Sequence, residues 1–144
     1  MARIPKRKLI PPSPNHGDPV LFAKMSDDVF EEMCVALFSR EADIRQADLY
    51  GRPREPQFGI DILGERERGD GIEVVSCKCY GQIKRGQLVE WSNDFLKHWD
   101  ARWRSQNVRR FVLAVAADVK SSARRAEIEA EKARFTTIGV TYEI

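Results

Sequence analysis

The stretch Gln57–Lys78, which reads QFGIDILGERERGDGIEVVSCK, constrains the fold of this chain more than any other segment. Two short apolar runs flank a charged turn that contains glycine, and this pattern predicts a β-hairpin. Each run carries one ionisable residue where an apolar residue would pack better. Asp61 lies between two isoleucines, and Lys78 lies between two cysteines. The hairpin therefore brings an acid and a lysine onto neighbouring strands.

Side chains of a strand alternate between the two faces of its sheet, so the second strand of the hairpin has two different faces. One face is predicted to carry Val74, Ser76 and Lys78, and the other Glu73, Val75 and Cys77. Burying a charged side chain is costly unless it is paired or binds a metal. An acid facing a lysine across a hairpin is typical of a small metal-dependent phosphodiester site, and equally of a structural Asp–Lys pair.

Length and composition narrow the class of protein. A chain of 144 residues predicts one domain, and a net charge of +2 restricts any basic binding surface to a local patch. There is no apolar run of about 18 residues and no secretory signal, so we expect no membrane association. The three cysteines are an odd number with one C-x-C spacing, which favours reduced thiols in a cytoplasmic protein over a zinc site.

The N-terminal part divides into an arm and the start of a domain. Residues 1–22 are rich in proline and in basic residues, which predicts a flexible arm, followed by a domain over residues 23–144. A helix is expected over 26–40, with Ser26 or Asp27 as N-cap. Glu31 lies at the border of its apolar face and Glu32 in solvent. That face is predicted to carry Phe30, Met33, Cys34, Leu37 and Phe38.

The remaining segments complete an α/β pattern. Residues 42–56 are read as a connector with a short edge strand, and 87–104 as a long helix. Apolar residues recur every four positions along that helix and predict a core stripe: Trp91, Phe95, Trp99 and Trp103. Residues 111–117 predict a central strand, 121–135 a helix and 140–144 a last strand. We expect a mixed central β-sheet flanked by helices.

Three short motifs in this order resemble the PD-(D/E)xK nuclease superfamily. They are Phe30-Glu31 in the first helix, Gly59-Ile60-Asp61 on one strand, and Ser76-Cys77-Lys78 on the next. More narrowly, they resemble the Mrr-like restriction endonuclease branch. The stretch GRPREPQFGIDI is similar to a variant found in nuclease domains of bacterial antiphage proteins. The resemblance covers about residues 26–144 and implies a restriction-endonuclease-like core in an effector nuclease of a restriction or defence system.

The resemblance also implies roles for individual residues. Mg²⁺ or Mn²⁺ would be held by Asp61, Glu31 and the backbone carbonyl of Cys77, and Lys78 would lie beside the attacking water. Gln57 would donate to a phosphate or position the lysine. The implied partners are double-stranded DNA and either a second copy of the chain or a fused sensor or NTPase module. Four basic residues are candidate phosphate contacts, or simply solvated surface: Arg52, Arg54, Lys84 and Arg85.

Ser76 departs from the family pattern, which has Glu or Gln at this position. A serine hydroxyl is a weaker ligand for a hard cation than a carboxylate. Three outcomes follow. The remaining ligands are sufficient to bind the metal, or Glu90 on the following helix replaces the missing acid, or the site has weak activity or none. In the last case the domain is a nuclease-derived DNA-binding or assembly module. We expect Ser76 to face, with Lys78, the helix that bears Glu31.

Overall fold

The computed structural model describes residues 25–51, 57–117 and 122–144. The arm expected at residues 1–22, and Arg52 and Arg54, lie outside the described residues. The elements in chain order are α3 (Asp27–Phe38), β1 (Ile44–Leu49), β2 (Ile62–Arg66), β3 (Ile72–Lys78), α4 (Gln87–Leu96), the π-helical turn η2 (Trp99–Trp103), the 3-10 turn η3 (Arg104–Gln106), β4 (Val108–Val115), α5 (Ser122–Thr136) and β5 (Thr141–Glu143).

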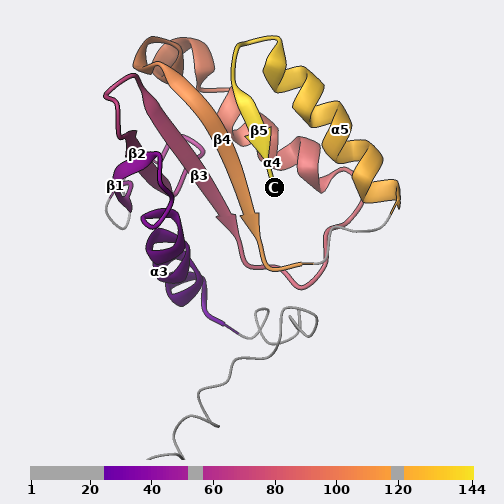
Figure 1. The fold of residues 1–144 in the computed structure, drawn as a ribbon. Coiled ribbons are helices and arrows are strands. Elements are labelled where there is room, and N and C mark those ends of the chain that lie inside the picture. Colours follow the sequence, from indigo (N-terminus) through magenta and orange to yellow (C-terminus); the bar gives the residue numbers. More distant parts are fainter. Residues whose placement is uncertain (1–24, 52–56, 118–121) are drawn as a thin grey trace, which may run out of the picture.

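The five strands form one mixed sheet in the order β1-β2-β3-β4-β5 (Figure 1). Strands β1, β2 and β3 are antiparallel neighbours, whereas β3, β4 and β5 run parallel. The expected hairpin is confirmed, because Ile62 pairs with Val75 and Glu65 with Ile72 across the charged turn. The expected edge strand is confirmed as β1. The α/β class with a mixed sheet and flanking helices is therefore confirmed.

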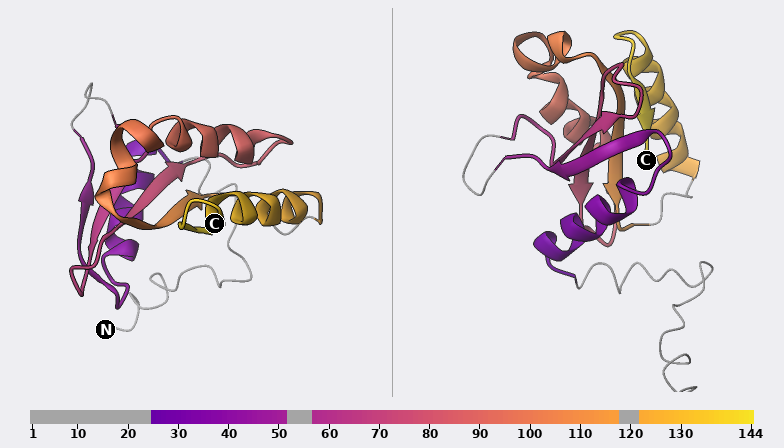
Figure 2. Two further views of the ribbon diagram at one scale, coloured as in Figure 1. Left: turned by 90° about the horizontal axis from the view of Figure 1, so that it is seen from above. Right: turned by 60° about the vertical axis from the view of Figure 1, so that its left-hand side comes forward.

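Helices cover both faces of the sheet, with α3 on one face and α4 and α5 on the other (Figure 2). The N-cap of α3 is Ser26, whose side chain accepts a hydrogen bond from the backbone N–H of Val29. Three α3 side chains are buried against the sheet: Phe30, Cys34 and Phe38. Leu37, expected on the same face, is 58% exposed, because it lies on a flank of the helix that the sheet does not reach. Glu32 is exposed, as predicted.

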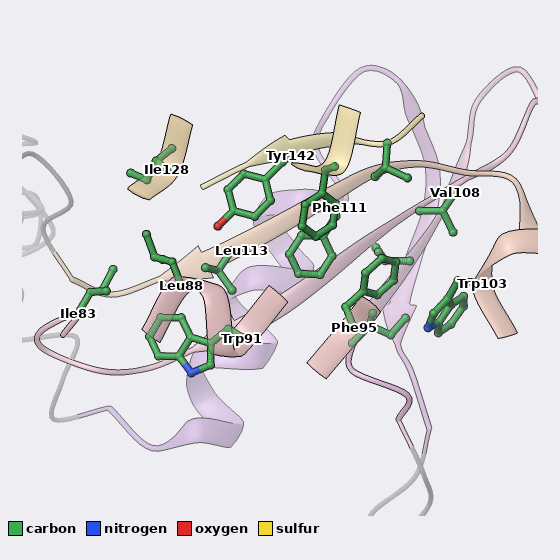
Figure 3. Packing of buried hydrophobic residues seen from close by; sticks show 14 residues of the cluster. Ile83, Leu88, Trp91, Phe95, Trp103, Val108, Phe111, Leu113, Ile128 and Tyr142 are labelled. Carbon is green, nitrogen blue, oxygen red and sulfur yellow. The ribbon is translucent and has the colours of Figure 1, made fainter. Parts of the chain in front are cut away.

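The larger core lies between the sheet and the helices α4 and α5 (Figure 3). The aromatic stripe is confirmed as core, since Trp91, Phe95 and Trp103 are all buried. The predicted long helix is wrong in its second half, because α4 ends at Leu96 and the chain continues as η2. Along a straight α-helix, each residue of a stripe with four-residue spacing lies about 40° further around the helix axis than the one before it. The wider turn of η2 brings Trp103 back to the core side.

One charged residue is fully buried in the sheet, at the end opposite to Lys78. Glu73 on β3 is 1% exposed and lies between Arg66 of β2 at 2.5 Å and Arg110 of β4 at 2.9 Å. Arg110 also pairs with Glu41 at 3.0 Å. Ion pairs on both sides offset the cost of burying this carboxylate, so the network ties β2, β3 and β4 together.

Candidate functional site

Asp61 is held in the plane of the sheet, directly before β2. Its backbone N–H donates to the carbonyl of Val75 at 2.8 Å, and its own carbonyl accepts from the N–H of Tyr50 at 2.8 Å. Its side-chain Oδ2 accepts a hydrogen bond from the backbone N–H of Cys77 at 2.7 Å. Burial raises the pKa of the Asp61 carboxyl, while the Cys77 N–H and the charge of Lys78 act in the opposite direction.

Glu31 lies on α3, one helical turn after the first residues of the helix, and is partly buried. Its pKa is raised from an ordinary 4.5 to about 7, first because of burial and then because of the negative charge of Asp61. Lys78 lowers it, so the lysine is also within electrostatic reach. Two acids that resist simultaneous ionisation beside a lysine are typical of metal-binding and catalytic sites.

Lys78 ends β3 and turns towards α4. Its Nζ lies 5.8 Å from the centre of the Trp91 ring, which is a cation–π distance. Tyr80 lies against the same indole, with ring centres 5.5 Å apart, and is about half exposed. The aromatic side chains thus hold the lysine at the end of β3. Glu31 and Lys78 approach Asp61 from opposite faces of the sheet, around the end of β3.

The expected direction of Ser76 is wrong. Ser76 is 3% exposed and shares its face with Val74 and Lys78, which is the face that α4 covers. Helix α3 packs instead on the Val75 face, because Phe30, Cys34 and Phe38 fill the space above Ile62 and Val75. The hydroxyl of Ser76 therefore lies on the other side of the sheet from the helix that bears Glu31.

Cys77 contributes its backbone to the site and its side chain to packing. Its thiol is hydrogen bonded to that of Cys34 on α3, and this bond together with burial raises the pKa of the Cys77 thiol. The thiol is therefore protonated and is a poor metal ligand. The N–H of Cys77 points at Asp61, and the carbonyl of a strand residue points to the same side as its N–H. We therefore expect the Cys77 carbonyl towards the acids.

Gln57 and Gly59 shape the loop before Asp61. The side-chain amide of Gln57 donates to the carbonyl of Tyr50 at 3.3 Å. Gly59 has a φ of 84°, and a Cβ there would lie 2.5 Å from the carbonyl oxygen of Asp94 on α4. The glycine is thus required by the contact with α4.

The other predicted residues lie at the margin of the site or outside it. Lys84 and Arg85 are exposed in the loop between β3 and α4. Glu90 is exposed on the first turn of α4, so it does not take the place of an acid at Ser76 within the buried part of the site. The contact of Lys78 with Trp91 was not predictable from the sequence, because the tryptophan belongs to a stripe with the spacing of core residues.

The donor set fits a weakly held, hydrated cation. Within residues 25–51, 57–117 and 122–144, no group of three or more His, Cys, Asp or Glu side chains is arranged to hold a metal. Mg²⁺, however, keeps several waters and is commonly bound by one or two carboxylates plus substrate phosphate. Glu31, Asp61 and the Cys77 carbonyl match that requirement.

No family model, curated protein or solved structure matches the chain. Among the described residues, no helix is long and apolar enough to span a bilayer.

Proposed function

We propose that this protein is a metal-dependent DNA endonuclease with a restriction-endonuclease-like core of the Mrr-like type, acting as a cytoplasmic effector in a bacterial restriction or antiphage system. One observation carries the proposal. Glu31, Asp61 and Lys78 come from three separate segments, and the charges of Asp61 and Lys78 both act on the Glu31 carboxyl, while Lys78 also acts on Asp61. These are the residues of the three motifs that resemble the PD-(D/E)xK nucleases.

The acids and the lysine have distinct tasks in this proposal. Glu31, Asp61 and the Cys77 carbonyl would hold Mg²⁺ or Mn²⁺, which supplies Lewis-acid stabilisation of the phosphate. Asp61 is prepared for this role because the Cys77 N–H fixes one carboxylate oxygen and leaves the other for a ligand. Lys78 stabilises the negative charge that develops on the phosphate and on the attacking water. Without a bound metal the pKa of Glu31 is raised to about 7, so a cation would have to displace a proton from this acid near neutral pH.

Double-stranded DNA is the proposed substrate. Lys84 and Arg85 are exposed in the loop between β3 and α4 and would provide phosphate contacts. Such contacts act through counterion release, so DNA affinity should fall steeply as salt rises from about 50 to 200 mM. Fluorescence anisotropy measures this dependence, and a flat response would argue against contacts with the phosphate backbone.

A second candidate function follows from Ser76. The site has two carboxylates and no acid at this position, and Ser76 is buried under α4. A nuclease-derived DNA-binding or assembly module without catalysis fits this feature. Calorimetry with Mn²⁺ separates the two functions, because the binding module would bind DNA without binding the metal.

The deciding experiment is nicking of supercoiled plasmid with Mg²⁺ or Mn²⁺, using EDTA as the blank. Asp61→Asn should lower the rate by about 100-fold or more, because the uncharged amide is a poor ligand for a hard cation. The matched control is Asp100→Asn, since that aspartate is highly exposed on η2. An Asp61→Asn protein that cleaves at the wild-type rate would exclude Asp61 as a metal ligand and with it the proposed active site.

A further inference from the structure

The turn that leads into Asp61 has an unusual backbone. Phe58 and Gly59 both have positive φ angles, of 54° and 84°. A left-handed conformation is uncommon for phenylalanine and persists only where surrounding contacts hold it. Asp61 follows two residues later, so any freedom in this turn would be transmitted to the acid.

One side of the turn is fixed by buried groups. The indole Nε1 of Trp103 donates to the carbonyl of Phe58 at 2.9 Å, and Trp103 itself is 1% exposed. Gly59 lies directly against the backbone at the end of α4, as described above. These contacts hold the backbone of the turn from the core side. The Phe58 ring packs edge to face against His98, with ring centres 5.4 Å apart, and it is also contacted by Arg102.

Arg102, the residue next to Trp103 in η2, covers the outer side of the turn. Its guanidinium carbon lies 4.6 Å from the centre of the Phe58 ring, 5.8 Å from that of Tyr50 and 5.6 Å from that of Trp103. Its Nη2 also donates a hydrogen bond to the hydroxyl of Tyr50. Within the described ranges, no carboxylate lies within 4 Å of this guanidinium, so its contacts are aromatic.

Tyr50 connects this cluster to the acid from the other direction. Its N–H donates to the carbonyl of Asp61, and its own carbonyl accepts from the side chain of Gln57. Arg102 therefore contacts both segments that flank Asp61, the turn at Phe58 and the end of β1 at Tyr50. A π-helical turn is often found at a functional site, and here it places Arg102 and Trp103 side by side on the loop.

We infer that Arg102 is a positioning residue for Asp61: its guanidinium holds the Phe58 turn against Tyr50 and thereby fixes the backbone of the acid. Only the catalytic meaning of this role rests on the proposed nuclease function. Arg102 does not touch Asp61, so it acts through Phe58 and Tyr50. A lysine cannot reproduce the planar stacking and directed N–H groups of arginine.

Amide hydrogen exchange measured by NMR tests the inference without any assay of activity. Arg102→Ala should accelerate exchange at the N–H groups of Tyr50 and Asp61 by about tenfold or more, while the amides of β4 keep their wild-type rates. Arg102→Lys should restore part of the protection. The control is Arg104→Ala, because Arg104 is exposed and pairs only with Asp100 at 3.2 Å among the described groups.

Two exchange results would overturn the inference. Unchanged exchange at Tyr50 and Asp61 would show that the turn is rigid without Arg102. Equal acceleration in β4 would show a general loss of stability. If the protein cleaves DNA, Arg102→Ala should lower kcat and leave KM within about twofold, whereas a raised KM with unchanged kcat would identify a DNA contact. If no cleavage occurs at all, the nuclease proposal fails and the exchange result still decides the role of Arg102.

Discussion

Replacement of Glu31 by glutamine should stabilise the protein at alkaline pH and have no effect at acidic pH. The folded protein holds the Glu31 proton with a pKa of about 7, compared with an ordinary 4.5. Between these values the folded state binds more protons than the unfolded chain, so stability falls as pH rises. The penalty is absent below about pH 4.5 and complete above about pH 7. Glutamine has a similar shape and carries no charge, so it removes the penalty.

The size of the effect follows from the same difference. Each pKa unit corresponds to about 1.4 kcal/mol, so the upper limit is about 3 kcal/mol. Glu31 is only partly buried, and solvent screens a charge in that position. We therefore expect Glu31→Gln to raise the free energy of unfolding by about 1 to 2 kcal/mol at pH 8. Urea unfolding in EDTA, followed by tryptophan fluorescence at pH 4.5, 6 and 8, measures this gain.

The matched control is Glu32→Gln, since Glu32 is the neighbouring acid and is exposed to solvent. Its effect should stay within about 0.5 kcal/mol at every pH, as is usual for surface positions. Mn²⁺ should reduce the advantage of Glu31→Gln, because a bound cation stabilises the wild-type acids by mass action. If Glu31→Gln changes stability equally at pH 4.5 and pH 8, Glu31 is not coupled to Asp61 and the three-residue site is wrong.

Three further substitutions test the packing around the site. Gly59→Ala should lower the free energy of unfolding, measured with urea, by about 3 kcal/mol, because it adds strain at positive φ to a clash with the α4 backbone. The control Gly69→Ala, which has positive φ but open space around it, should lower it by about 1 kcal/mol. Glu73→Ala should lower the free energy of unfolding by about 3 kcal/mol, because two arginines lose their buried partner. Glu65→Ala, at an exposed ion pair, should lower it by less than about 1 kcal/mol. Ser76→Glu should lower both the thermal midpoint and Mn²⁺ affinity by calorimetry, because the site under α4 has no room for a charged side chain. Tighter Mn²⁺ binding by Ser76→Glu would contradict this packing argument.

Local patterns predicted the elements of this fold well. The hairpin followed from two apolar runs and a charged turn, and the start of α3 followed from Ser26, because caps and turns depend on nearby residues only. The apolar run of β4 predicted a strand covered on both faces, which the two hydrophobic clusters confirm. The break after Leu96 was missed, because a four-residue period is close enough to the helical repeat to be read as one helix, although its rotation of about 40° per step is better accommodated by a wider turn.

The sequence indicated which residues to consider for the candidate site, but it did not indicate how the fold arranges them in space. Alternation along β3 placed Ser76 and Lys78 on one face, but it carried no information on which helix covers that face. That choice depends on how α3 and α4 divide the two faces between them. Phe30 and Cys34 pack on the Val75 side, so the face of Ser76 is left to α4.

Because α3 and α4 cover opposite faces of the sheet, the candidate site can contain two acids and a lysine without an acid at Ser76. Glu31 reaches Asp61 from the α3 face, while Trp91 of α4 holds Lys78 on the opposite face. The acids and the ammonium group can therefore meet only at the end of β3, where the backbone N–H of Cys77 faces Asp61. Under the proposed function, such an arrangement would supply few metal ligands from the interior of the sheet and would leave the others to water and phosphate. If the proposed nuclease function holds, we expect Mn²⁺ to bind weakly in the absence of DNA and more tightly in its presence.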